Sequence, residues 1–417
     1  MLFGRIIEIF KSQRLIIENF GYLTLLNIYN LFLPLLIYPY LIRVLGTETY
    51  GLVIFVQTII AYFSIFINLG FNISATKEIA IYHNNKRKLS EIISSVLIIT
   101  STIWLVFFFF LLLLTFTIPV FKENKILFII GYGATFNDFL FITSYFQGLQ
   151  RMKYITIINA VTRTIYLMLV FLIVKTSKEY LYVILLNSIM FLINGLICIY
   201  IIFFKDGIKF KIQPYNILRN YIIKTLPIFY FNLFGSIKSK SNEIFLGFAT
   251  TYTSVTAYNL SSKITFLSTS IFANLSNAIY PNISISKNIN QGKKYLLFIM
   301  FTSLIFYLMI VLFAKHIIAL LAGANTFSSY NILYIVGASI PLYSTSTAIG
   351  QILLLPNGLN REFSFGTVIS TVVYLILVGF QFYFDAVNIY SLSYDLLISN
   401  LISVLIRLYY AYKNYLL

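Results

Sequence analysis

Three charged residues stand near the middle of a segment that otherwise suits a membrane-spanning helix. The stretch 226–248 has about the length that crosses a bilayer, and Lys238, Lys240 and Glu243 lie within it. A charge at the bilayer centre costs about 2.5–3.5 kcal/mol on insertion scales. Such residues are therefore expected to pair with one another, to face a water-filled cavity, or to bind a ligand of opposite charge.

Lys238 has no evident anionic partner on its own helix. At 100° per residue it shares a face with Ser241 and Asn242, whereas Lys240 lies nearer to Glu243. We hypothesise that this helix lines a polar cavity in which Lys238 meets an anion. The nearby serines also fit close helix packing, which is common in membranes.

Further charges are expected deep in other spans. Asp138 and Arg163 lie at matched depths on neighbouring antiparallel helices, which predicts a structural ion pair. Glu243 is expected to pair with Lys240 or Lys263 in the same way. Even with both pairs formed, cations outnumber anions inside the spans. The two carboxylates expected at this depth, Asp138 and Glu243, are also candidates for coupling to an ion gradient.

The composition explains why lipid must surround this chain. It is 59% hydrophobic and 10% charged, with a mean hydropathy of +0.87, whereas globular chains carry roughly 25% charged residues. Its one cysteine, Cys198, excludes an intramolecular disulfide. The opening "MLFGRIIEIFKSQR" lacks the features of a cleavable signal and predicts an amphipathic segment, 1–15, on the cytoplasmic surface.

Hydropathy predicts an all-α polytopic membrane protein with about twelve transmembrane helices. Pro227 lies at the predicted start of the seventh span, where its missing N–H is tolerated. The predicted spans are 16–41, 50–72, 92–117, 126–147, 155–175, 180–203, 225–248, 255–280, 295–315, 329–354, 364–384 and 391–412.

The distribution of Lys and Arg sets the predicted orientation. With both termini in the cytoplasm, most of the 30 basic residues fall on the inner side, and Arg407 is counted there at the end of the last span. This bias accounts for most of the net charge of +17 without a nucleic-acid partner. Both termini are therefore predicted to be cytoplasmic.

The chain is predicted to consist of two six-helix bundles. The long polar segment 204–224 is interpreted as a cytoplasmic linker between bundles at 16–203 and 225–417. A Gly-Leu-polar-Arg motif recurs, at 148–151 and 358–361, after the fourth span of each half. Halves with an even number of spans would be related by a pseudo-two-fold axis along the membrane normal, around a central cavity.

The motifs of common enzymes are not found. No Walker A pattern occurs, and His83 and His316 are far apart, so no metal site or catalytic triad is predicted. We expect no cofactor apart from a proton or sodium gradient that could drive transport. The default function is the movement of a substrate across the membrane.

Several stretches resemble one family over essentially the whole chain. "LPLLIYPYLIRVLGTETYGLVIFVQTIIAYFSIFINLGFNISATKEIA", "YFQGLQRMKYITIINAVTRTIYLMLVF", "NEIFLGFATTYTSVTAYNLSSKI" and "GQILLLPNGLNREF" resemble the Wzx-type polysaccharide repeat-unit flippases. These belong to the multidrug/oligosaccharidyl-lipid/polysaccharide exporter superfamily. The family pattern usually has an aspartate near Asn242, which is followed here by Glu243.

The resemblance implies a flippase in the bacterial inner (cytoplasmic) membrane for undecaprenyl-pyrophosphate-linked oligosaccharide repeat units, such as those of O-antigen, moved to the outer leaflet by alternating access. Lys238, Lys240, Lys263 and Arg163 would then supply a cationic cavity for the pyrophosphate. Implied partners are membrane lipids and a polysaccharide polymerase with its chain-length regulator. The alternatives are a polymerase or ligase acting on the same lipid-linked sugars, a multidrug exporter of the same superfamily, and a structural scaffold for polysaccharide assembly.

Overall fold

The computed structural model describes residues 2–323 and 329–416 and contains helices but no strand among them. Nine segments of this described part are long and apolar enough to cross a membrane. The prediction of an all-α polytopic membrane protein is confirmed. The helices α10 (Tyr215–Ala249) and α11 (Tyr252–Ser286) are not among the nine; α10 carries three charged residues in its second half and α11 is rich in Ser and Thr.

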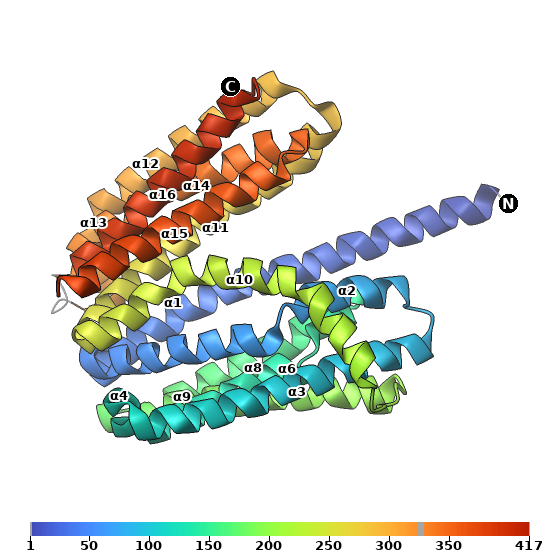
Figure 1. Cartoon of the computed structure of the whole chain (residues 1–417), viewed down its shortest axis with the longest axis horizontal. Coiled ribbons are helices and arrows are strands. Elements are labelled where there is room, and N and C mark those ends of the chain that lie inside the picture. Colours follow the sequence, from blue (N-terminus) through green and yellow to red (C-terminus); the bar gives the residue numbers. More distant parts are fainter. Residues whose placement is uncertain (1, 324–328, 417) are drawn as a thin grey trace. The chain divides into compact units, whose positions relative to one another are not determined.

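The helices divide into two compact units (Figure 1). Unit 1 comprises Met1–Tyr40 and Val56–Leu233, and unit 2 comprises Leu41–Phe55 and Phe234–Leu417. The predicted bundles, in contrast, divide at 204–224.

The α-helices are α1 (Leu2–Asn68), α2 (Phe71–Ile81), α3 (Lys86–Thr117), α4 (Pro119–Glu123), α5 (Lys125–Tyr132), α6 (Phe136–Leu140), α7 (Thr143–Gly148), α8 (Met152–Ile173), α9 (Tyr180–Tyr200), α10 (Tyr215–Ala249), α11 (Tyr252–Ser286), α12 (Ile289–Ala322), α13 (Ser329–Gly337), α14 (Ser339–Ala348), α15 (Asn360–Tyr383) and α16 (Ile389–Lys413).

The first long element, α1, is two helices joined at a glycine. Gly46 has φ 78° and ψ 164°, a conformation that glycine adopts readily and other residues rarely do. The break separates the two predicted spans 16–41 and 50–72. Residues 2–15 of the predicted amphipathic segment 1–15 lie in α1, but the side chains of this segment fall outside what the structure describes, so its amphipathic character stays a prediction.

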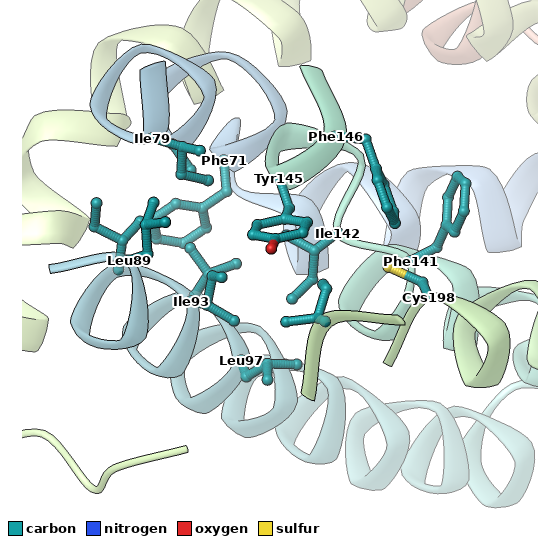
Figure 2. Close-up of a cluster of buried hydrophobic side chains, with 14 of the residues drawn as sticks. Phe71, Ile79, Leu89, Ile93, Leu97, Phe141, Ile142, Tyr145, Phe146 and Cys198 are labelled. Atoms are coloured by element: carbon teal, nitrogen blue, oxygen red, sulfur yellow. The ribbon is translucent and has the colours of Figure 1, made fainter. Parts of the chain in front are cut away.

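The core of unit 1 forms where α2, α3, α7 and α9 meet. Figure 2 shows Phe71 and Ile79 of α2 beside Ile93 of α3, with Tyr145 of α7 and Cys198 of α9 nearby. All five side chains are buried. This packing gives α2 and α3 a fixed inner face, so the residues on their other faces are held in place.

The segment between α9 and α10 is attached to unit 1 before α10 begins. The carboxylate of Asp206 accepts hydrogen bonds from Arg151 at 2.7 Å and from the hydroxyl of Tyr145 at 2.6 Å. The backbone N–H of Lys211 donates to Ser94 of α3 at 2.9 Å. The first part of the predicted linker is therefore ordered against unit 1.

Unit 2 is built from α11–α16 with the second half of α10 and the segment Leu41–Phe55 of α1. The helix pairs α15–α16, α11–α13, α12–α14 and α14–α16 pack directly against each other. Between α14 and α15 the chain widens into a π-helix, Ile349–Leu354. π-Helical turns within α-helices are frequent at functional sites.

Two glycines allow the segment after Gly46 to pack closely within unit 2. A Cβ atom at Gly51 would lie 1.8 Å from the carbonyl oxygen of Tyr252, and one at Gly247 would lie 2.0 Å from the ring of Phe55. Real Cβ atoms essentially never approach other atoms so closely. Both positions therefore require glycine for packing.

We expect Gly51→Ala to destabilise the protein by about 1–3 kcal/mol, the usual cost of overpacking a well-packed interior. The matched control is Gly235→Ala, since a Cβ there meets nothing within 4 Å and alanine favours a helix by about 0.5–1 kcal/mol. Thermal unfolding in detergent should show a lower Tm for the first variant and an unchanged or higher Tm for the second. Equal Tm values for the two variants would contradict the packing.

Candidate functional site

The predicted lysines lie on a helix that begins earlier than expected. Helix α10 starts at Tyr215, so Pro227 lies inside it rather than at its start. Lys238 is partly buried in unit 2, and its ammonium group donates to the hydroxyl of Ser370 on α15 at 3.2 Å. No ion pair joins Lys238 to a carboxylate in the part of the chain that the structure describes.

Arg407 is a second buried cation in the same unit. Its position on the cytoplasmic side stays a prediction, but the structure places it inside α16 with 5% of its surface exposed. Its guanidinium donates to the carbonyl oxygen of Ser346 at 2.8 Å and to the hydroxyl of Thr367 at 2.8 Å. It also lies over the ring of Phe363, 4.3 Å from the centroid.

Space for the guanidinium comes from glycines on two neighbouring segments. A Cβ at Gly366 would lie 3.1 Å from Cγ of Arg407, and one at Gly350 would lie 2.3 Å from the ring of Phe363. A sequence signal for this burial exists: Ser399, Ser403 and Arg407 are spaced four residues apart, which puts them on one small-residue face of α16.

Lys238 and Arg407 together make unit 2 electropositive inside. Thr367 and Ser370, which accept from the two cations, lie one helical turn apart on α15. Neither cation forms an ion pair with any carboxylate of the described residues. An anionic ligand near Lys238 would offset this uncompensated charge.

Asn242, one turn beyond Lys238, joins four helices. Its amide nitrogen donates to the hydroxyl of Tyr258 on α11 at 2.8 Å and to the carbonyl oxygen of Leu392 on α16 at 3.1 Å. Its amide oxygen accepts from the hydroxyl of Tyr374 on α15. An amide, unlike a carboxylate, can both donate and accept, so it satisfies this buried network without adding charge.

Glu243 is also buried, and it accepts a hydrogen bond from the amide of Asn259 on α11. Lys263 lies four residues after Asn259, so it projects from the same face of α11. Lys240 and Lys263 are both partly buried in unit 2. The pairing of Glu243 with either lysine stays a prediction.

The other predicted pair belongs to unit 1. Asp138 lies on the short helix α6, Arg163 lies on α8, and both helices pack against α9. Both side chains are partly buried. Their mutual ion pair and their roles in substrate binding or ion coupling stay predictions. The four predicted cations are thus divided, with Arg163 in unit 1 and the three lysines in unit 2.

Unit 2 contains a further buried carboxylate that the sequence analysis did not single out. Asp395 on α16 is 5% exposed and accepts a hydrogen bond from Gln381 of α15 at 2.6 Å. The described residues contain no group of three or more His, Cys, Asp or Glu side chains placed to hold a metal ion.

Comparison with known proteins identifies the family. The model of the family described as "Polysaccharide biosynthesis protein" matches residues 16–287. A protein of Escherichia coli (strain K12) named "Putative O-antigen transporter" is 26% identical over 368 residues, which are 87% of this chain and 88% of that protein. A protein of the same name from Shigella dysenteriae is 24% identical over 272 residues, covering 64% of this chain and 67% of its own length.

Solved structures share the fold at low sequence identity. The lipid II flippase MurJ, in an inward closed conformation, superposes with a TM-score of 0.75 at 17% identity, covering 93% of this chain and 87% of MurJ. An inward-facing multidrug transporter of the MATE family gives a TM-score of 0.67 at 13% identity, covering 91% of this chain and 97% of the transporter. The chain therefore belongs to the polysaccharide biosynthesis protein family, as a Wzx-like member of the multidrug/oligosaccharidyl-lipid/polysaccharide superfamily.

Proposed function

We propose that this protein is a flippase that moves undecaprenyl-pyrophosphate-linked oligosaccharide repeat units from the cytoplasmic to the outer leaflet of the bacterial inner membrane. The observation that carries the proposal is the electropositive interior of unit 2, where Lys238 and Arg407 form no ion pair with a described carboxylate. A pyrophosphate supplies the missing negative charge. Family membership and the names of the relatives support the same substrate class.

The two cations have different tasks in this proposal. Lys238 is partly exposed and uses one hydrogen bond to Ser370, so its ammonium group has donors left for a phosphate oxygen. Arg407 is enclosed and bonded to its neighbours, so it acts through its field and does not touch the substrate. A hydrophobic tail can stay in lipid while the charged group and the sugars cross.

The rival functions predict different charged and catalytic groups inside the protein. A MATE-type exporter of cationic drugs would be served by acidic groups facing the drug, and the fold alone does not separate it from a flippase. In unit 2, Lys238 and Arg407 form no ion pair with a described carboxylate, and the buried Asp395 accepts a hydrogen bond from Gln381 rather than from either cation, which favours an anionic substrate near Lys238. A polymerase or ligase would need catalytic groups acting on the sugars, and a scaffold would not need buried charges at all.

Energy for transport is the second part of the proposal. We propose that a proton or sodium gradient drives the cycle of alternating access and that Asp138 or Glu243 binds the coupling ion. The orientation with both termini in the cytoplasm belongs to the same proposal, as do contacts with a polysaccharide polymerase and its chain-length regulator.

The test of the function is a gel of surface polysaccharide from the source strain with the gene deleted and then restored. We expect the deletion to remove the polymer completely, single repeats included, while lipid-linked repeat units accumulate inside the cell. Restoring the wild-type gene should reverse both effects. Loss of long chains with single repeats still displayed would indicate a polymerase and overturn the proposal.

A further inference from the structure

Unit 1 contains a cavity of about 360 Å³ that none of the proposed transport residues lines. It lies where α2 and α3 meet the first turns of α10, in segments predicted to face the cytoplasm. We call it the α2–α3–α10 cavity. Its lining consists of Glu78, Tyr82, Lys88, Glu91, Asn216, Ile217, Asn220, Tyr221 and Lys224.

The charges in this cavity cancel, in contrast to those of unit 2. Lys88 contacts Glu91 at 2.6 Å, and Lys224 contacts Glu78 at 3.0 Å. Two cations and two anions line the same space, each paired with an opposite charge. A free anion or cation entering it would meet no net opposite charge, so the lining favours a neutral ligand that forms many hydrogen bonds.

Aromatic rings form part of the wall. Tyr82 has 39% of its surface exposed, and the ammonium group of Lys88 lies 5.8 Å from its ring centroid. Tyr221 is 7% exposed and donates to the carboxylate of Glu91 at 3.4 Å. Burial and the carboxylates of Glu78 and Glu91 raise the pKa of Tyr221, so its phenol stays protonated.

Two exposed amides complete the lining. Asn216 and Asn220 lie four residues apart, on the face of α10 that also carries Lys224. Neither side-chain amide forms a hydrogen bond with another described side chain. The N–H groups and the carbonyl oxygen of each amide are therefore available to a ligand. Carboxylate and amide groups beside a tyrosine ring can hydrogen-bond the hydroxyls of a sugar while the ring packs against its C–H face.

The walls of the cavity are held in place from behind. The inner faces of α2 and α3 carry Ile79, Leu89 and Ile93 into the core of unit 1. On the α10 side, the hydroxyls of Ser74 and Thr225 lie 2.8 Å apart. The cavity is therefore a preformed site, of a volume within the usual range for small-ligand pockets.

We propose that the α2–α3–α10 cavity binds a neutral pyranose ring of the substrate glycan. This inference rests on the proposed function and adds a sugar-recognition site to it, separate from the cations of unit 2. The glycan could reach the cavity on its lipid carrier or as a soluble oligosaccharide. The chemistry recognised is the same in both cases.

The test compares three probes on the purified full-length protein in nanodiscs: the lipid-linked repeat unit extracted from the deletion strain, undecaprenyl pyrophosphate without sugar, and the oligosaccharide released by mild acid. The variant is Asn216→Ala/Asn220→Ala, which removes exposed amides without disturbing the core. We expect it to bind the lipid-linked unit at least five-fold more weakly and bare undecaprenyl pyrophosphate as the wild type does. Asn290→Ala, an exposed amide on α12, is the control and should bind all probes normally.

The outcomes separate this inference from the proposed function. Equal weakening on both lipid probes, or no weakening on any probe, would overturn the sugar site. If the wild type binds the released oligosaccharide and the double variant does not, the sugar site is supported. If the lipid-linked unit also fails to compete with this oligosaccharide, the ligand of the site is a soluble glycan. The proposed function is checked separately by Lys238→Ala, which should weaken both lipid probes alike.

Discussion

Cells whose only copy carries Lys238→Ala are expected to display at least ten-fold less surface polysaccharide than cells with the wild-type gene. Lys238 is the partly exposed cation of unit 2, and its hydrogen bond to Ser370 leaves donors for a phosphate oxygen. Removing one charge-assisted contact costs about 1.5–3 kcal/mol, and ten-fold corresponds to about 1.4 kcal/mol. The measurement is densitometry of polysaccharide gels at matched protein levels.

Two further variants make this result specific. Lys294→Ala removes an exposed lysine from the first turns of α12 and should leave polysaccharide at the wild-type level. Lys238→Arg keeps the charge and should restore part of the activity. Normal polysaccharide in cells with Lys238→Ala, at normal protein level, would remove Lys238 from the substrate site.

The Arg407→Ala variant is expected to lose about 3 kcal/mol or more of stability, the largest loss among the substitutions considered. The guanidinium donates to the carbonyl oxygens of Ser346 and Phe363 and to the hydroxyl of Thr367. Alanine leaves these buried acceptors without a donor and opens a cavity beside Gly350. Thermal unfolding in detergent should show a large drop in Tm, with less folded protein in the membrane.

The matched control is Arg361→Ala, which removes an exposed arginine from the start of α15 and should change Tm little. Arg407→Lys keeps the charge but cannot reproduce the forked donor geometry, so we expect an intermediate Tm. A Tm for Arg407→Ala equal to that of the Arg361→Ala control would show that the hydrogen bonds around Arg407 do not stabilise unit 2.

The helices themselves could be predicted because their signal is local. Runs of apolar residues bounded by charged loops predicted long helices near those observed, as with 92–117 against α3 (Lys86–Thr117) and 364–384 against α15 (Asn360–Tyr383). The start of α10 was missed because polar residues of 215–224 looked like a linker. In the structure this stretch forms helix whose inner face packs on unit 1 through Tyr221.

The surroundings of the charged residues could be predicted only in part. The lysines of α10 stood out because they interrupt an apolar run, but Arg407 lies near a helix end, where basic residues are ordinary. Its burial depends on Gly350 and Gly366, which are distant in sequence and make room for it from other segments. The α2–α3–α10 cavity likewise joins residues about 130 positions apart, and no local pattern brings them together.

The hydroxyl-rich helix α11 has a mechanical consequence. Its first turns are tied to other segments of unit 2, since Thr256 donates to the carbonyl oxygen of Thr47, and Asn259 donates to Glu243. Farther along, the hydroxyls of Ser261, Ser268 and Ser276 donate to carbonyl oxygens of α11 itself. Sliding this part of α11 past its neighbours would break none of these three bonds. Helix α11 is thus hydrogen-bonded to other segments in its first turns, whereas these three serines farther along would not hold it in place.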